Sequence, residues 1–269
     1  MIASRAFVWI LPLLSAQAPE PSIDPALLQA GQKIVEGLSV LPPGAELNTY
    51  FEVQMGPNNA IGYVTGSLKS VAGQDGTSYA YSSDVIMKGL GGQVRAEMRA
   101  RLKPTFEPLE VTMRRGTFRD GEKGEMAVRA DFGARDVILS VANEVQARTQ
   151  EVPRPEAPVF FAIDMLAQRL DISNREPFAL REFSANAGDA GVVRFEFGTW
   201  KDGSRTLVVR QEDGRVGYQF WYDQEGNVVR WMHVILPVLF VRCTAERIQE
   251  IKAALGEVMR LQVPVPPSN

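Results

Sequence analysis

Histidine and cysteine are nearly absent from this chain of 269 residues, which contains one of each, His233 and Cys243. A single thiol cannot form an intramolecular disulfide. The common structural and catalytic zinc sites need several cysteine or histidine ligands, and one of each cannot provide them. We therefore expect no metal site and no cofactor.

The motifs that usually reveal an enzymatic activity are also missing. A Ser-His-Asp arrangement would need His233, but no G-x-S-x-G elbow supplies the nucleophile. Residues 116–123, GTFRDGEK, have the glycine spacing of a phosphate-binding loop, but Glu122 stands where the lysine must be. Hydrolysis by a carboxylate pair leaves no spacing signature among the 32 acidic residues. The sequence therefore identifies no catalytic residue, favours a non-enzymatic protein and leaves enzymatic activity undecided.

Neither sign of charge predominates. The 29 basic and 32 acidic residues give a formal net charge of −3, so no nucleic-acid partner is expected. Arginines do concentrate between residues 95 and 129, with glutamates such as Glu97 and Glu110 among them. This mixture favours cross-strand ion pairs over a basic face for an anionic partner.

Long apolar runs are lacking as well. Residues 1–18, MIASRAFVWILPLLSAQA, place Arg5 before an apolar run over residues 6–14, and Ala16 and Ala18 before a potential cleavage point. That order is typical of a secretory signal peptide, and the run is shorter than the roughly 20 residues of a membrane span. We expect a signal peptide over residues 1–18, export to the periplasm or secretion, and no transmembrane span after cleavage.

Alternation with a period of two residues dominates what remains. Between residues 93 and 102, every second side chain is apolar and the intervening ones are polar or charged. Clean alternation is typical of a strand with one packed face and one face in water. Similar segments extend from residue 47 to about 149, and turn signals separate them every 8–12 residues. This pattern predicts a long antiparallel meander.

Helix signals interrupt the strands at three places: Asp24-Pro25, Pro158 and Thr244 each precede an apolar stripe with helical spacing. We expect a mainly β (α+β) protein whose long, curved, half-barrel-like meander carries an N-terminal helix, one helix inserted between strands and a C-terminal helix. The predicted organisation after the signal peptide is a linker and helix (19–43), a first β half (44–150), a proline-rich connection and helix (151–176), a second β half of the same domain (177–243), a C-terminal helix (244–262) and a disordered tail (263–269).

The segment 215–235, RVGYQFWYDQEGNVVRWMHVI, gathers the rare residue types into one predicted hairpin. Two aromatic and β-branched runs flank a polar loop in which Gly226 or Asn227 can take the positive φ that the turn requires. Trp221, Trp231 and His233 lie in these runs. We treat these three as candidate ligand-binding residues, on the condition that the sheet encloses a cleft.

The order of these elements resembles the lipoprotein-carrier half-barrels of the LolA/LolB type and related exported β-rich domains of unknown function. The resemblance concerns the layout of residues 47–243 and the hairpin over residues 221–230, WYDQEGNVVR, with its aromatic, aspartate, glycine and arginine. It implies a curved sheet whose concave side can hold an acyl chain or another apolar ligand.

Together these observations favour an exported, soluble binding protein that holds an apolar or amphipathic ligand, either a lipid or a lipidated partner, on the concave face of the sheet. Two alternatives stay open: a protein-interaction or scaffold module of the cell envelope, and a carboxylate-dependent hydrolase. The deciding feature is whether the predicted helix over residues 158–170 fills the concave face or leaves it open. Ligand identity and oligomeric state do not follow from the sequence.

Overall fold

The computed structural model describes residues 24–57, 59–73, 76–89, 91–119, 121–154, 159–173, 176–184, 189–234, 236, 238–258 and 260–268. The predicted signal peptide lies outside the described residues. The helices in this part of the chain are α1 (Pro25–Glu36), α2 (Ile163–Ala167) and α3 (Ala245–Leu255). The strands are β1 (Glu46–Gln54), β2 (Ala60–Gly73), β3 (Gly76–Gly89), β4 (Gly92–Leu102), β5 (Pro108–Arg119), β6 (Glu122–Phe132), β7 (Asp136–Asn143), β8 (Ala147–Pro153), β9 (Val159–Phe160), β10 (Phe178–Ser184), β11 (Asp189–Thr199), β12 (Arg205–Gln211), β13 (Val216–Tyr222), β14 (Val228–His233) and β15 (Leu239–Arg242).

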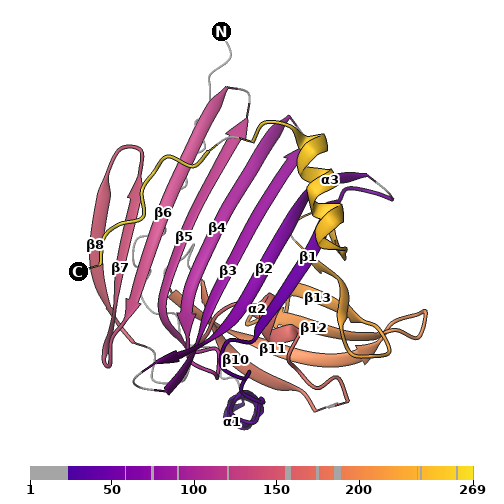
Figure 1. The fold of residues 1–269 in the computed structure, drawn as a ribbon. Coiled ribbons are helices and arrows are strands. Elements are labelled where there is room, and N and C mark those ends of the chain that lie inside the picture. The colour runs from indigo at the N-terminus through magenta and orange to yellow at the C-terminus, as the bar shows by residue number, and fades with distance from the viewer. Residues whose placement is uncertain are drawn as a thin grey trace.

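All 15 strands described belong to one sheet, in the spatial order β8 to β1 followed by β15 to β9. The two meanders join where β1 pairs with β15, and every neighbouring pair is antiparallel except β9 with β10. Figure 1 shows β1–β8 as a tall wall, with β10–β13 running across its lower end. The predicted fold class, a mainly β protein built on a long curved antiparallel sheet with three helices, is confirmed.

The alternation seen in the sequence separates the two faces of the wall. Tyr79 and Tyr81 of β3 and Leu102 of β4 are buried in the core on the concave side. On the opposite face, Glu97 lies across from Arg114, with 3.4 Å between Oε2 and Nη1, and also contacts Arg95 at 2.7 Å. The interpretation of the arginines as members of cross-strand ion pairs is confirmed for Arg114, whereas Arg95 and Glu97 pair within β4.

The middle helix is shorter than the sequence pattern predicts. Val159 and Phe160 form β9 and pair with β10, and Ala162 has a left-handed backbone with φ 65°. A helix cannot continue through a left-handed residue, so α2 begins at Ile163. The prediction of a helix starting at residue 158 is therefore wrong at its N-terminal end.

The outer helices begin where their caps predict. The Asp24 carboxylate accepts a hydrogen bond from the amide of Ala26 at 2.9 Å, and the Thr244 hydroxyl accepts one from Arg247. α1 packs on β10, whereas α3 lies on the convex side of the wall, where Ile248 and Ile251 cover an apolar cluster on β2 and β3. No helix in the described part of the chain has both the length and the apolar character needed to cross a membrane.

The C-terminal tail is ordered where the sequence predicts disorder. Residues 260–268 run across the convex face of the wall (Figure 1). The side chain of Val263 is buried. Glu125 of β6 accepts hydrogen bonds from the amides of Gln262 and Val263, each at 2.7 Å, while Arg114 donates to the carbonyls of Leu261 and Val263. The prolines of the tail exclude helix, but an extended segment can be held by polar side chains of the sheet.

Candidate functional site

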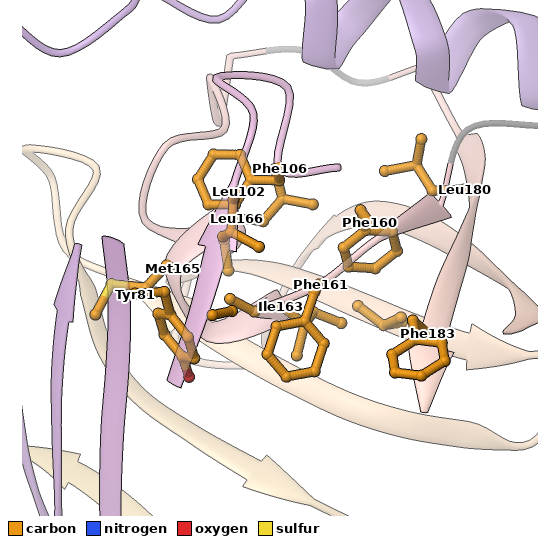
Figure 2. Packing of buried hydrophobic residues seen from close by; sticks show 14 of the residues in the cluster. Tyr81, Leu102, Phe106, Phe160, Phe161, Ile163, Met165, Leu166, Leu180 and Phe183 are labelled. Carbon is orange, nitrogen blue, oxygen red and sulfur yellow. The ribbon is translucent and has the colours of Figure 1, made fainter. Parts of the chain in front are cut away.

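The concave side of the sheet contains a cleft of about 730 Å³. α2 fills only part of this side, because Met165, Leu166 and Ala167 are buried in the core while the residues just before them line the cleft. Figure 2 shows Met165 and Leu166 packed near Tyr81 and Leu102. α2 therefore fills one part of the concave face, and the cleft occupies the part next to it.

The walls of the cleft are mostly apolar. They come from strands of both meanders and from the segment before α2, and include Val64, Val85, Met98, Met113, Phe161 and Phe183. The ring of Phe161 stands edge-on to Tyr81, with 5.9 Å between centroids, and lies 6.5 Å from the ring of Phe183 (Figure 2). Methionine side chains are flexible and adapt to ligands of irregular shape.

Two polar side chains meet at the N-terminal end of α2. The hydroxyl of Tyr81 donates a hydrogen bond to Oδ1 of Asp164 over 3.1 Å. Burial raises the pKa of Asp164, although hydrogen bonds from Tyr81 and the amide of Met165 oppose that effect. Burial, followed by the charge of Asp164, raises the pKa of Tyr81 well above its usual range, so the phenol stays protonated.

A second carboxyl group, that of Glu182, lines the same cleft from β10. Burial and then the charge of Asp164 raise the pKa of Glu182 to about 7. Within the described part of the chain, Glu182 has no hydrogen bond or ion pair. Burial and the nearby charges of Glu182 and Asp164 also raise the pKa of Tyr218 far above its usual range.

The structure brings two of the three candidate residues to the cleft. Trp231 and His233 of β14 line it, and the His233 ring packs edge-on against Tyr218 with 4.8 Å between centroids. Burial lowers the pKa of His233, so the imidazole is neutral at pH 7.

Trp221 lies outside the cleft. Its neighbours Phe220 and Tyr222 belong to the core cluster of the concave side, and successive residues of a strand point to opposite faces. Trp221 packs edge-on against Trp200 at 5.6 Å, and the Arg230 guanidinium lies 4.8 Å above its ring. These contacts give Trp221 a packing role on the other face of β13.

The lining of the cleft is acidic. Among the described residues it contains no lysine or arginine, and its acidic members are Asp164, Glu182, Asp189, Glu212 and Asp213. In the same part of the chain, no group of three or more His, Cys, Asp or Glu side chains is placed to hold a metal ion. Among the described residues, the lining therefore carries negative charge that no lysine, arginine or metal-binding cluster of the cleft balances.

Tyr81, Asp164, Glu182 and Tyr218 were not identified as site residues by the sequence. A signal was nevertheless present for the acids. Glu182 shares a strand face with the buried Phe178 and Leu180, and Asp164 stands alone within the apolar run 159–167, VFFAIDMLA. A carboxyl group on an otherwise apolar face marks a functional site more often than a solvent-exposed carboxyl group does. Its desolvation lowers the stability of the fold, so such a residue usually has another role.

Comparisons with known proteins assign no family to this chain. No family model matches it, and neither does any curated protein. Among solved structures, a β-barrel-like protein of a domain of unknown function, DUF1849, from Brucella abortus superposes with a TM-score of 0.43 at 11% identity, over 77% of this chain and 96% of that chain. The half-barrel layout agrees with the prediction from the resemblance, but membership of the LolA/LolB-like carriers is not shown.

Proposed function

We propose that this chain is a binding protein that holds an apolar or amphipathic molecule in the cleft beside α2. The observation that carries the proposal is an unfilled volume of about 730 Å³ with apolar walls and a few polar groups. Small-molecule sites have this composition and volumes of about 300–1,000 Å³. Protein cores are otherwise packed with few voids larger than a water molecule. A lipid, or the lipid moiety of a partner protein, has the required chemistry.

The proposal predicts that a neutral apolar dye such as Nile red binds at one saturable site. Val85→Trp places a bulky ring on the cleft wall and is expected to weaken dye binding at least tenfold, measured by fluorescence titration. Val145→Trp makes the same change at a residue that is 91% exposed and outside the cleft, so its affinity should equal that of the unaltered protein. Absence of saturable binding, or equal binding by both variants, would overturn the proposal.

Export to the periplasm or secretion is part of the proposal and is supported by the leader-like residues 1–18. The protein recovered from outside the cytoplasm should begin near residue 19 when its N-terminus is sequenced. Recovery of the full-length chain from the cytoplasm alone would contradict this localisation.

Carboxylate-dependent hydrolysis is the second candidate function, because Asp164 and Glu182 line one cleft and Glu182 is partly protonated near neutral pH. An enzyme would release altered product, whereas a carrier would retain its ligand unchanged. Mass spectrometry of the bound molecule before and after incubation separates the two. A scaffold role has less support, since the large exposed apolar side chains are scattered over strand ends and loops: Val40, Val71, Val145, Trp200, Val234 and Leu236.

A further inference from the structure

We propose that the molecule held in the cleft is an organic cation, with an aliphatic or aromatic body on the apolar walls and a protonated amine between Asp164 and Glu182. This inference rests on the proposed binding function and deepens it by naming the charge of the ligand. It excludes free fatty acids and other amphiphiles whose head group is a carboxylate or phosphate.

The first reason is the charge of the lining. Five acidic residues border the cleft, and no lysine or arginine does so among the described residues. Of these acids, Asp213 is paired with Arg215, but Asp164 and Glu182 form no ion pair in the described part of the chain. Charges of one sign in a concave, weakly polarisable site attract the opposite charge and repel their own. An anionic head group would therefore be disfavoured there.

The second reason is the unused hydrogen-bonding capacity of the two carboxyl groups. Glu182 is partly buried and has no partner in the described part of the chain, so its carboxyl group is free to accept hydrogen bonds from a ligand. Asp164 accepts a hydrogen bond from Tyr81 and retains further acceptor capacity. An ammonium group carries three donors and the compensating charge, so it satisfies both acids at once.

The aromatic and apolar walls of the cleft fit the charge and the hydrocarbon body of an organic cation. The aromatic ring of Tyr218 lines the cleft together with these acids, and the face of an aromatic ring attracts a cation. Trp231 stacks between Phe220 and Phe240, with 6.1 and 3.7 Å between centroids, so it contributes a fixed apolar wall. Phe161 and Phe183 offer apolar contact for an aliphatic chain.

Binding should also depend on pH. The other titratable residues lining the cleft are Tyr81, Asp164, Asp189, Glu212, Asp213, Tyr218 and His233. The pKa values of both tyrosines are raised and that of His233 is lowered, so these three stay neutral near pH 7. Glu182, with a pKa of about 7, gains charge between pH 6 and 8. A bound cation favours the ionised form, so its affinity should rise with pH and binding near neutrality should release a proton.

The test compares dodecylamine, dodecanol and dodecanoate by isothermal titration calorimetry at pH 7. The amine and the carboxylate are kept below their micelle concentrations, and the alcohol below its solubility limit. The amine should bind at least tenfold more tightly than the alcohol, and dodecanoate more weakly than the alcohol. In Glu182→Gln the ratio of amine to alcohol affinity should fall severalfold. In Glu151→Gln, the same change at an exposed position on β8, the ratio should be unaltered.

Two further readouts separate this effect from misfolding. The amine affinity should increase severalfold from pH 6 to pH 8 in the unaltered protein and change less in Glu182→Gln. The heat of amine binding should vary with the ionisation enthalpy of the buffer, because a proton is released. Equal affinities for amine and alcohol, or tightest binding of dodecanoate, would overturn the cation assignment and leave the binding function intact. Failure of all three probes to bind would overturn both.

Discussion

Replacing Gly31 by alanine is expected to lower the free energy of unfolding by about 2–3 kcal/mol, within the range for overpacked cores. Alanine favours a helix over glycine by about 1 kcal/mol, so helix propensity alone predicts the opposite sign. Gly31 is buried where α1 packs on β10. An added Cβ would lie 2.0 Å from the carbonyl oxygen of Ala179 and 2.9 Å from Cδ2 of Leu180. Because the nearest atom belongs to the backbone of the sheet, α1 must move away from β10.

Urea unfolding followed by circular dichroism measures this change. Gln32→Ala serves as the control, because Gln32 is the next residue of α1 and is exposed. The control should shift the free energy of unfolding by less than about 0.5 kcal/mol. If Gly31→Ala proved as stable as the unaltered protein, α1 would not pack on β10 as closely as described. β10 also carries Glu182, so the same variant should weaken ligand binding.

Replacing Glu125 by alanine is expected to lower the free energy of unfolding by about 3 kcal/mol. The change removes a buried carboxylate and leaves its hydrogen-bonding partners without an acceptor. The side chain of Glu125 is 1% exposed and contacts Lys123 at 2.8 Å. It also accepts hydrogen bonds from the amides of Gln262 and Val263. Loss of these hydrogen bonds should release the C-terminal tail from the convex face. Limited proteolysis should then remove the tail much faster than in the unaltered protein.

The effect of Glu125 should vanish in acid. Burial alone raises the pKa of this carboxyl, but hydrogen bonds from Lys123 and the amides of Val263 and Gln262 outweigh burial and hold the pKa below 4.5. The ionised form therefore stabilises the fold fully above pH 4.5, and this stabilisation is lost as the pH falls through the lowered pKa. Unfolding curves of Glu125→Ala and the unaltered protein should differ at pH 7 and converge in strong acid. Glu122→Ala, at an exposed site on β6, should show no such difference.

Local patterning explains why most of the sheet could be predicted. Strand alternation and turn glycines act within a few residues, so they specify segments such as β4 and the hairpin of β13 and β14 directly. Gly226 at the hairpin has φ 85°, as the turn requires. The caps Asp24 and Thr244 likewise act on the amides next to them. These features need no knowledge of the rest of the chain.

The middle helix and the tail were mispredicted for the opposite reason. Residues 159 and 160 look helical in isolation, but their backbone pairs with β10, about twenty residues later in the chain. The tail is rich in proline and looks disordered, but Glu125 and Arg114 of distant strands hold its backbone. Long-range partners decided both outcomes, and neither leaves a local signal.

The sequence by itself determined the strands except β9, the three helices as elements, and the scarcity of histidine and cysteine. Only the tertiary structure decided that α2 fills part of the concave face and that a cleft remains beside it. It also placed Asp164 and Glu182, from separate elements, in one cleft with Trp231 and His233, and left Trp221 on the other side of β13. The physical reason is that burial of a charge and the shape of a cavity depend on how distant segments pack, which local periodicity does not encode.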